Sequence, residues 1–304
     1  MLNWNGWKDT IACVESILDL GHADFSLLIV DNGSTDGSEE RIRAFLHEKK
    51  RPQPWEVLQT GANLGYAGGN NAGLRRAMED GWADYIWLLN NDTVVDKDAL
   101  SAMLSCFKND PQTGMAGSKL LYHNRPSVIQ GAGGCRLTPW FGNTALIGND
   151  VPDGKGRHDE KENPDYISGA SLLVKKEVIK KIGVFDENYF LYWEDADWGI
   201  RARRAGYGLI YCPESRVFHK EGGTCGKTTQ LTDYYWVRNG LYFTKKFYPW
   251  FLPSALPAYL FKYLVLRPLK LKKGPANAKA LFRGIFDFLR SRTGKMLSDK
   301  GATG

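Results

Sequence analysis

The 304-residue sequence has few cysteines and no long uncharged apolar run. Its five cysteines are odd in number and never form a C-x-x-C pair, so we expect neither a disulfide framework nor a zinc knuckle, and a reducing cytoplasm fits best. No basic segment followed by an apolar core begins the sequence, so we expect no signal peptide. The most apolar stretch, 250–266, contains two prolines and a lysine and is shorter than the roughly 20 residues that span a bilayer. We therefore expect no membrane span.

The composition is that of a globular protein, with 43% hydrophobic and 24% charged residues. It excludes a disordered chain, a collagen-like chain and a coiled coil. The net charge of +6 is unevenly distributed, because residues 1–232 carry −5 and the residues from Asp233 onward carry +11. The C-terminal part therefore differs electrically from the rest.

Helical and strand patterns alternate through the first part of the chain. Apolar spacing predicts helices at about 7–18, 38–45 and 71–79, and buried strands at 25–30, 55–58 and 85–89. This alternation predicts an α/β fold with a mostly parallel sheet, in which ligands bind at the carboxyl ends of the strands. Further on we expect a hairpin and surface excursion within 120–165, strands at 167–174, 208–212 and 216–219, and a helix at 194–205.

Two polar motifs follow these strands. Asn90-Asn91-Asp92 comes directly after a buried strand, where a carboxylate can bind a hard divalent cation; an Asx turn is the alternative. The segment 63–71 contains three glycines and three asparagines, and we expect a loop before a helix, suited to phosphate or sugar oxygens. It matches neither a P-loop nor a dinucleotide fingerprint, and a simple tight turn is the alternative.

Three carboxylates begin the helix at 194. Glu194, Asp195 and Asp197 lie among aromatic residues that could stack on a sugar ring, and one of the acids could serve as a general base. The alternative is a structural cluster stabilised by the helix dipole. Arg201 follows Asp197 by four residues and could pair with it. His219 ends a predicted strand, where a structural role is the alternative to a ligand role.

Together these segments resemble glycosyltransferase family 2, whose members are nucleotide-sugar-dependent enzymes of the GT-A fold, and within it the rhamnosyltransferase-like bacterial members. The resemblance covers about residues 1–230 and rests on seven segments in the family's order: 3–6, 30–37, 63–73, 89–93, 168–170, 194–197 and 217–219. It implies a Rossmann-like α/β sandwich. We divide the chain into a GT-A catalytic domain, 1–231, with a nucleotide-binding half at about 1–118 and an acceptor half at about 119–231, and a helical C-terminal region, 232–304.

The resemblance also implies roles for individual residues. Asp195 matches the catalytic base of inverting members, and Glu194 would bind an acceptor hydroxyl. Asp92 matches the last position of the family's D-x-D signature and His219 matches a metal-ligating histidine, so the implied cofactor is Mg²⁺ or Mn²⁺. The implied nucleotide-binding residues are Asn3, Asn5, Asp31, Asn63, Gly68, Asn71, Asn90 and Asn91. The segment 221–229 would form a lid over the nucleotide.

The implied function is inverting transfer of one sugar, with L-rhamnose from dTDP-rhamnose as our interpretation, to a hydroxyl of a growing, polyprenyl-linked cell-surface glycan. A UDP- or GDP-sugar donor and a catalytically silent sugar-nucleotide-binding protein are the alternatives. The absence of a Q-x-x-R-W signature favours addition of a single sugar. We expect a cytoplasmic protein, peripherally associated with the inner face of the cell membrane, and no nucleic-acid partner.

Two features of the chain ends qualify the resemblance. Family members usually have a longer hydrophobic first strand, and here only Met1 and Leu2 precede Asn3. Either the start lies upstream or the strand is truncated.

At the other end, aromatic residues within 250–266 and four Lys and Arg residues within 267–273 suit an anionic membrane surface. A second helix follows, with Phe282, Ile285, Phe286 and Leu289 on one face; packing on the catalytic domain, or on a second subunit as a homo-oligomer, is the alternative.

Overall fold

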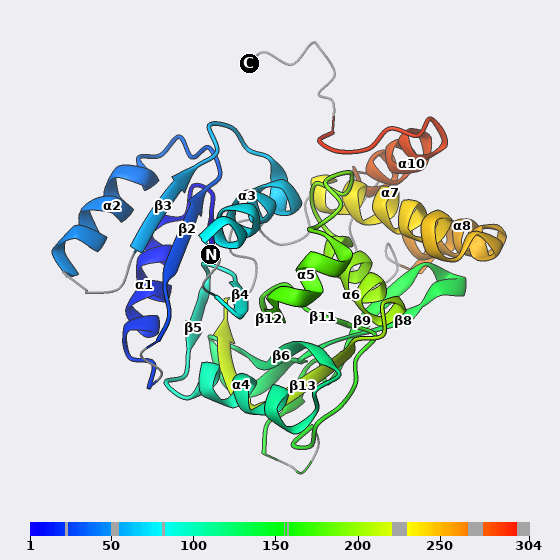
Figure 1. Cartoon of the computed structure of the whole chain (residues 1–304). Coiled ribbons are helices and arrows are strands. Elements are labelled where there is room, and N and C mark those ends of the chain that lie inside the picture. Colours follow the sequence, from blue (N-terminus) through cyan, green and yellow to red (C-terminus); the bar gives the residue numbers. More distant parts are fainter. Residues whose placement is uncertain are drawn as a thin grey trace.

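The computed structural model describes residues 1–21, 24–49, 55–80, 83–154, 156, 158–220, 230–266 and 276–296. It shows an α/β fold in which helices cover a strongly twisted β-structure, and a group of helices from the C-terminal part lies at one end (Figure 1). The predicted α/β class is confirmed. The mostly parallel sheet that we expect from the sequence is found only in the N-terminal part, because the larger sheet is paired antiparallel except between β6 (Thr113–Tyr122) and β13 (Gly208–His219).

The N-terminal part contains a parallel sheet of three strands in the order β1 (Leu2–Asn3), β2 (Leu27–Asp31) and β3 (Trp55–Gln59). Alternate side chains of β2 point to opposite faces of the sheet, and both faces are covered by other elements. Leu27 and Ile29 pack in the core formed with α1 (Trp7–Leu18) and α2 (Ser38–Lys49). Val30 faces Gly73 of α3 (Gly65–Asp80) on the other side.

A larger, mixed sheet continues the structure in the order β10-β7-β6-β12-β4, with β13 pairing both β5 and β6. Its strands are β4 (Tyr85–Leu89), β5 (Thr93–Val95), β6 (Thr113–Tyr122), β7 (Arg125–Ala132), β10 (Val151–Pro152), β12 (Ser171–Lys175) and β13 (Gly208–His219). A third sheet contains β11 (Tyr166–Ile167), β8 (Gly134–Thr138) and β9 (Asn143–Leu146). The remaining helices are α4 (Ala99–Asn109), α5 (Lys176–Ile182), α6 (Glu194–Arg204), α7 (Gln230–Phe247), α8 (Leu252–Phe261) and α10 (Ala276–Leu289), with the short helical segments η1 (Pro139–Phe141), η2 (Pro249–Phe251) and η3 (Lys262–Leu266).

Several predicted boundaries differ from the structure. The strand expected at 167–174 is two strands, β11 and β12, because the turn 168–170 interrupts the pairing. The strands expected at 208–212 and 216–219 are one strand, β13, whose register with β6 is irregular between Cys212 and Arg216. The hairpin expected within 120–165 is confirmed by the antiparallel pair β6 and β7.

The expectation of no disulfide is wrong. Cys106 of α4 and Cys212 of β13 are joined by a disulfide across a sequence separation of 106 residues. Cysteine spacing carries no signal for such a pair, because the two residues meet only when α4 packs on β13. Cys13 and Cys135 are buried free thiols.

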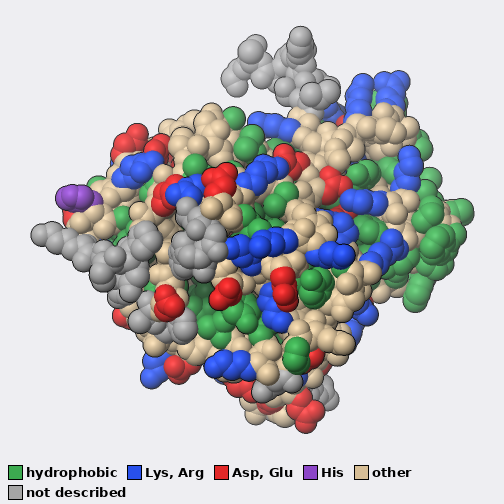
Figure 2. Space-filling view, viewed as in Figure 1, with side chains coloured by type: hydrophobic (Ala, Val, Ile, Leu, Met, Phe, Trp, Pro, Cys, Tyr) green, Lys and Arg blue, Asp and Glu red, His purple; other side chains and the backbone are tan. Residues whose placement is uncertain are grey.

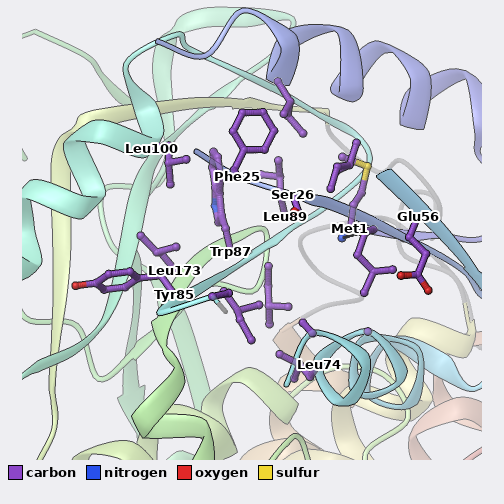
Figure 3. A pocket seen from close by; sticks show the side chains of 18 of the residues that line it. Met1, Phe25, Ser26, Glu56, Leu74, Tyr85, Trp87, Leu89, Leu100 and Leu173 are labelled. Carbon is purple, nitrogen blue, oxygen red and sulfur yellow. Dashed lines mark hydrogen bonds between the residues drawn. The ribbon is translucent and has the colours of Figure 1, made fainter. Parts of the chain in front are cut away.

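A cavity of about 430 Å³ lies between β2 and β4 (Figure 3). At the end of this cavity, Leu2 of β1 pairs in parallel with Val30 of β2 and forms a parallel bridge to Asn90 beyond the end of β4. Along residues 25–28 of the β2 segment and 85–88 of β4, no described strand pairs with the edges that face each other, and apolar side chains of both segments line the cavity.

The C-terminal helices pack on the rest of the protein. Lys246 of α7 forms ion pairs with Asp186 at 2.7 Å and with Asp197 at 2.6 Å. In α10, Ile285 packs toward α7 while Phe282, Phe286 and Leu289 are exposed, so the four residues expected on one face are divided between the core and the surface. The proposed lid, 221–229, and the basic residues of 267–273 lie outside the described residues. No helix in the described ranges combines the length and apolarity that a bilayer crossing requires.

Candidate active site

The carboxyl ends of β1 and β2 bring Asn3 and Asp31 together. Asn3 donates from Nδ2 to Asp31 Oδ2 at 2.7 Å, and both side chains are fully buried. Asp31 Oδ1 also accepts hydrogen bonds from the Ser34 N–H and the Gln59 amide, each at 2.9 Å. Asn5 lies nearby at a positive φ of 51°, and its Oδ1 accepts from the Thr35 N–H at 2.8 Å. These contacts order the turn after β2.

The segment 63–71 is mostly helical, so the expectation of a loop before a helix at 71 is wrong. α3 begins at Gly65, whose N–H donates to Asn63 Oδ1 at 2.8 Å. This bond closes an Asx turn that orders the chain directly before α3, and the helix starts six residues earlier than expected.

The residues of this segment point in different directions. A Cβ at Gly69 would lie 2.5 Å from Leu2 of β1, so this side of α3 faces the parallel sheet. Gly68 is buried beneath Leu64. Asn71 points elsewhere: its amide donates to Phe185 O at 3.0 Å and its Oδ1 accepts from Phe185 N–H at 2.9 Å. The structure therefore brings Asn63, but not Asn71, to the end of the parallel sheet.

The turn after β4 contributes Asn90, Asn91 and Asp92. Asn91 is buried, and its amide donates to Thr10 Oγ1 at 3.0 Å, which ties the turn to α1. The Asn90 side chain makes no hydrogen bond within the described part of the chain, and its backbone N–H donates to Ala170 O at 3.0 Å. The Asn90 side chain therefore remains available for a ligand, while Asn91 has a structural role.

Asp92 faces His219 across the sheet. The His219 Nε2 atom lies 3.1 Å from Asp92 Oδ1, and its Nδ1 atom lies 2.7 Å from Gln130 Oε1 of β7. With Oε1 in this position, an Nδ1–H can donate to Gln130, and Nε2 faces the Asp92 carboxylate. The distance from Nε2 to Oδ1 suits two ligand atoms of one metal ion as well as a direct hydrogen bond. The pair therefore fits one side of a metal site, and Gln130 is the orienting partner that the sequence did not indicate.

In the described ranges no group of three or more His, Cys, Asp or Glu side chains could hold a metal ion. Among the described residues of these types, Asp92 and His219 thus form a group of two and not of three or more. A cation bound by them would keep most of its coordination positions for other oxygen atoms.

Glu194 and Asp195, which we call the acid pair, are the first two residues of α6. Asp195 is half-buried, and its carboxylate accepts from the Ala196 N–H at 2.8 Å and the Gly169 N–H at 3.3 Å. Burial of the carboxyl group raises the pKa of Asp195 to about 6. Glu194 is 4% exposed, and its Oε2 atom has no hydrogen-bond partner within the described residues. Burial, and then the charge of Asp195, raise the pKa of Glu194 well above its usual value.

The third acid of this motif has a structural role. Asp197 is fully buried and binds Arg201 at 2.6 Å, which confirms the expected pairing. It also accepts from Tyr189 Oη at 3.1 Å, besides the ion pair with Lys246. Its oxygens are therefore engaged by other side chains, unlike those of Asp195 and Glu194.

The turn 168–170 links the acid pair to the Asn90–Asp92 turn. Gly169 N–H donates to Asp195, while Ala170 O accepts from Asn90 N–H. Tyr66 of α3 donates to Gly169 O at 2.8 Å, and its pKa is raised well above the usual value by burial and by the charges of Glu194, Asp195 and Asp92. A base candidate and a metal-site candidate thus lie around one turn.

Two residues of α7 support the loop before the acid pair. This loop carries three positive-φ residues that are not glycine, Phe190, Tyr192 and Trp193. Asn239 donates from Nδ2 to the carbonyl groups of Tyr189, Leu191 and Tyr192 at 2.8, 2.7 and 3.0 Å, and Arg238 donates to Tyr189 O at 3.0 Å. Sequence reasoning missed both residues, because nothing in their spacing indicates which loop they contact.

With this geometry established, comparison with known proteins decides the family. A profile of "Glycosyl transferase family 2" matches residues 1–183. The chain belongs to glycosyl transferase family 2. The resemblance inferred from its motifs is therefore confirmed, and the protein is a glycosyltransferase.

Curated relatives of this glycosyltransferase include an N-acetylglucosaminyl-diphospho-decaprenol L-rhamnosyltransferase of Mycobacterium tuberculosis. The two are 29% identical over 219 residues, which cover 66% of this chain and 68% of the relative. The low-salt glycan biosynthesis hexosyltransferase Agl10 of Haloferax volcanii is 23% identical over 201 residues, covering 66% of this chain and 60% of that protein.

Solved structures with the same fold include a mannosyltransferase of Pyrobaculum calidifontis in complex with GDP-Man and Mn²⁺. Its TM-score is 0.58 at 14% identity, with 96% of this chain and 86% of that chain covered. GalNAc-T7 with UDP, GalNAc and Mn²⁺ has a TM-score of 0.65 at 14% identity, with 96% of this chain and 54% of that chain covered. The architecture of the glycosyltransferase is therefore the GT-A fold.

Proposed function

We propose that this glycosyltransferase is a metal-dependent inverting enzyme that transfers a single sugar from a nucleotide-sugar donor to a hydroxyl group. The observation that carries the proposal is the turn 168–170, around which Asp195 lies on one side and Asn90 and Asp92 on the other. An inverting transfer requires a base on the acceptor side of the sugar and a cation on the diphosphate side.

Asp195 is the proposed base. It takes the proton from the acceptor hydroxyl as that oxygen forms a bond to the anomeric carbon. The bond between this carbon and the diphosphate oxygen breaks, and the nucleoside diphosphate leaves with the electron pair on the opposite face, which inverts the configuration. The raised pKa of Asp195, about 6, suits a group that must accept a proton near neutral pH. Glu194, with its unpartnered Oε2 atom, would accept a hydrogen bond from the acceptor.

Asp92 and His219 are the proposed metal ligands. A bound Mn²⁺ or Mg²⁺ would neutralise charge on the donor diphosphate, and the imidazole ligand favours Mn²⁺, because Mg²⁺ prefers oxygen ligands. Asn3, Asn5, Asp31, Asn63 and Asn90 would form the nucleotide site at the ends of β1, β2 and β4. Gly68, Asn71 and Asn91 would support it from within the fold.

We further propose L-rhamnose as the sugar, dTDP-rhamnose as the donor and a polyprenyl-linked glycan as the acceptor, on the basis of the mycobacterial relative's name. The proposed location is the inner face of the cell membrane. We also propose that the chain divides into a catalytic domain, 1–231, and a C-terminal region, 232–304.

A donor panel tests the function. The purified protein is incubated with dTDP-rhamnose, UDP-sugars and GDP-sugars, with and without Mn²⁺, together with a short-chain polyprenyl-diphosphate N-acetylglucosamine, and released nucleoside diphosphate is measured. We expect release from dTDP-rhamnose that depends on Mn²⁺ and on the acceptor. Turnover of another donor alone would replace the sugar assignment, and binding of a donor without turnover of any would overturn the enzyme proposal.

A further inference from the structure

Aromatic side chains from two distant segments form one exposed patch. Trp140 and Phe141 of η1 are 49% and 56% exposed, and Trp250 of η2 is 66% exposed. The rings of Trp140 and Phe251 lie 6.1 Å apart, edge to face, and Trp250 adjoins Phe251 at 6.1 Å. We call Trp140, Phe141, Trp250 and Phe251 the aromatic platform. Hydrophobic side chains gather at the edge of the molecule where α8 lies (Figures 1 and 2).

Hydrogen bonds hold the two halves of the platform together. Ser254 of α8 donates from Oγ to the Trp140 carbonyl at 2.7 Å, and Lys262 donates to Asn143 Oδ1 at 2.8 Å. Tyr259 donates from its hydroxyl to the Gly142 carbonyl, and a Cβ at Gly142 would lie 2.7 Å from the Tyr259 ring. The platform is thus a built surface, in which the turn between β8 and β9 is fixed to α8.

The C-terminal helices that flank η2 are rich in cations. Their described residues, 234–266 and 276–286, contain six Lys and Arg residues and no Asp or Glu; Arg238 is buried and Lys246 is engaged in ion pairs. Lysine and arginine side chains lie beside the apolar edge in Figure 2. Large aromatic rings combined with cations are typical of proteins that bind the interface of an anionic bilayer, where the rings enter the headgroup region and the cations contact lipid phosphates.

We propose that the aromatic platform docks the protein on an anionic lipid surface. The proposal rests on the proposed function for its purpose, because a lipid-linked acceptor would be presented at such a surface. A second copy of the chain is the less suitable partner, since a symmetric contact would place two positively charged regions against each other. The exposed face of α10, formed by Phe282, Phe286 and Leu289, is not part of the platform.

Vesicle binding tests the assignment. The full chain is sedimented with vesicles of phosphatidylcholine mixed with phosphatidylglycerol, and with vesicles of phosphatidylcholine alone, in the absence of any donor. We expect binding to the mixed vesicles that weakens at high salt. The double variant Phe141→Ser/Trp250→Ser should bind about tenfold more weakly, whereas Leu231→Ser, which changes an apolar residue of α7 with 42% exposure, should bind as the parent does.

Two results would overturn the proposal. The first is unchanged vesicle binding by Phe141→Ser/Trp250→Ser. If Phe282→Ser/Phe286→Ser abolishes binding in that case, the lipid contact lies on α10 instead. The second is a parent dimer that the double variant converts to a monomer without loss of vesicle binding. Transfer to a water-soluble acceptor analogue is measured in parallel. If the parent protein shows no transfer, that result counts against the proposed function only, because vesicle binding requires no turnover.

Discussion

His219 Nε2 lies 3.1 Å from Asp92 Oδ1, although the two residues are 127 positions apart in the sequence. β13 pairs antiparallel with β5, with His219 opposite Thr93, and this register places the imidazole beside the residue that precedes Thr93. Gln130 orients the ring from β7. The proposed ligand pair is therefore assembled from β13 and the turn before β5, with its histidine oriented from β7.

Replacing His219 should weaken metal activation. His219→Ala removes one of two proposed ligands, so the Mn²⁺ concentration for half-maximal transfer should rise about tenfold or more. Gln130→Met keeps the side-chain size but removes the acceptor of the Nδ1 proton, and its effect should be smaller and of the same sign. Both are measured as Mn²⁺ titrations of transfer after chelator treatment. A parental Mn²⁺ dependence in His219→Ala would show that the histidine is not a ligand.

Asp195→Asn should lower kcat by at least about a hundredfold, because the amide cannot accept the hydroxyl proton. The variant keeps the size of the side chain, so donor binding, measured by calorimetry, should be unchanged. Asp197→Asn is an informative comparison. Because Asp197 forms ion pairs with Arg201 and Lys246, this substitution should lower stability more than it lowers kcat. Transfer at the parental rate by Asp195→Asn would remove this residue as the base.

The pKa of Asp195, about 6, predicts a pH dependence of the parent enzyme. The base must be ionised, so kcat should rise as the pH rises through about 6 and level off above it. Stability should respond with the opposite sign, because the folded protein holds this proton up to about pH 6 whereas the unfolded chain loses it near 3.8. The contribution of Asp195 to the free energy of unfolding therefore falls between these pH values and should be absent in Asp195→Asn. Urea unfolding across this pH range provides the measurement.

Asn239→Asp should disturb the acid pair from a distance. The substitution removes the amide donor that binds three carbonyl groups of the loop before Glu194, and unpaired buried carbonyls cost about 1–3 kcal/mol. We expect lower stability in urea and a reduced kcat with little change in donor KM. Thr244→Val is the matched control, because it removes one buried hydrogen bond to Gly240 within the same helix, α7, and leaves the loop contacts intact. An equal loss of kcat in both variants would contradict a positioning role for Asn239.

Adding four apolar, β-branched residues before Met1 should stabilise the protein. Continued from Leu2 in register, they would lie opposite Leu28 to Phe25 on one side and Leu88 to Tyr85 on the other, in the cavity of about 430 Å³. The extension would also remove the buried ammonium group of Met1, whose pKa burial lowers to about 6. The Tm should rise by about 2–4 °C for each kcal/mol gained.

A pH comparison separates the two contributions. Between about pH 6 and its usual value of 8.0, the Met1 ammonium stays protonated in the unfolded chain but not in the folded protein, so parental stability should rise with pH there. The extended protein should lack this rise. An extension of the same length with alternating prolines serves as the control, because proline cannot pair in the middle of a sheet. Equal Tm values for the two extensions would show that the cavity does not accept a strand.

The sequence by itself determined the alternation of helices and strands, the family and the order of the motifs. These features depend on local patterns: the buried strand at 85–89, the helix that begins with Glu194, and the polar residues that follow each strand. Residues close in sequence share one element, so periodicity and turn chemistry are sufficient to predict them.

Only the tertiary structure decided which of these residues meet. It joined Asp92 to His219, placed the turn 168–170 between Asn90 and Asp195, and separated Asn71 from the end of the parallel sheet. It also brought Cys106 to Cys212 and Trp140 to Phe251, pairs that no spacing rule indicates. The physical reason is that strand register and helix packing bring residues a hundred positions apart into contact, and both depend on how the whole core is filled.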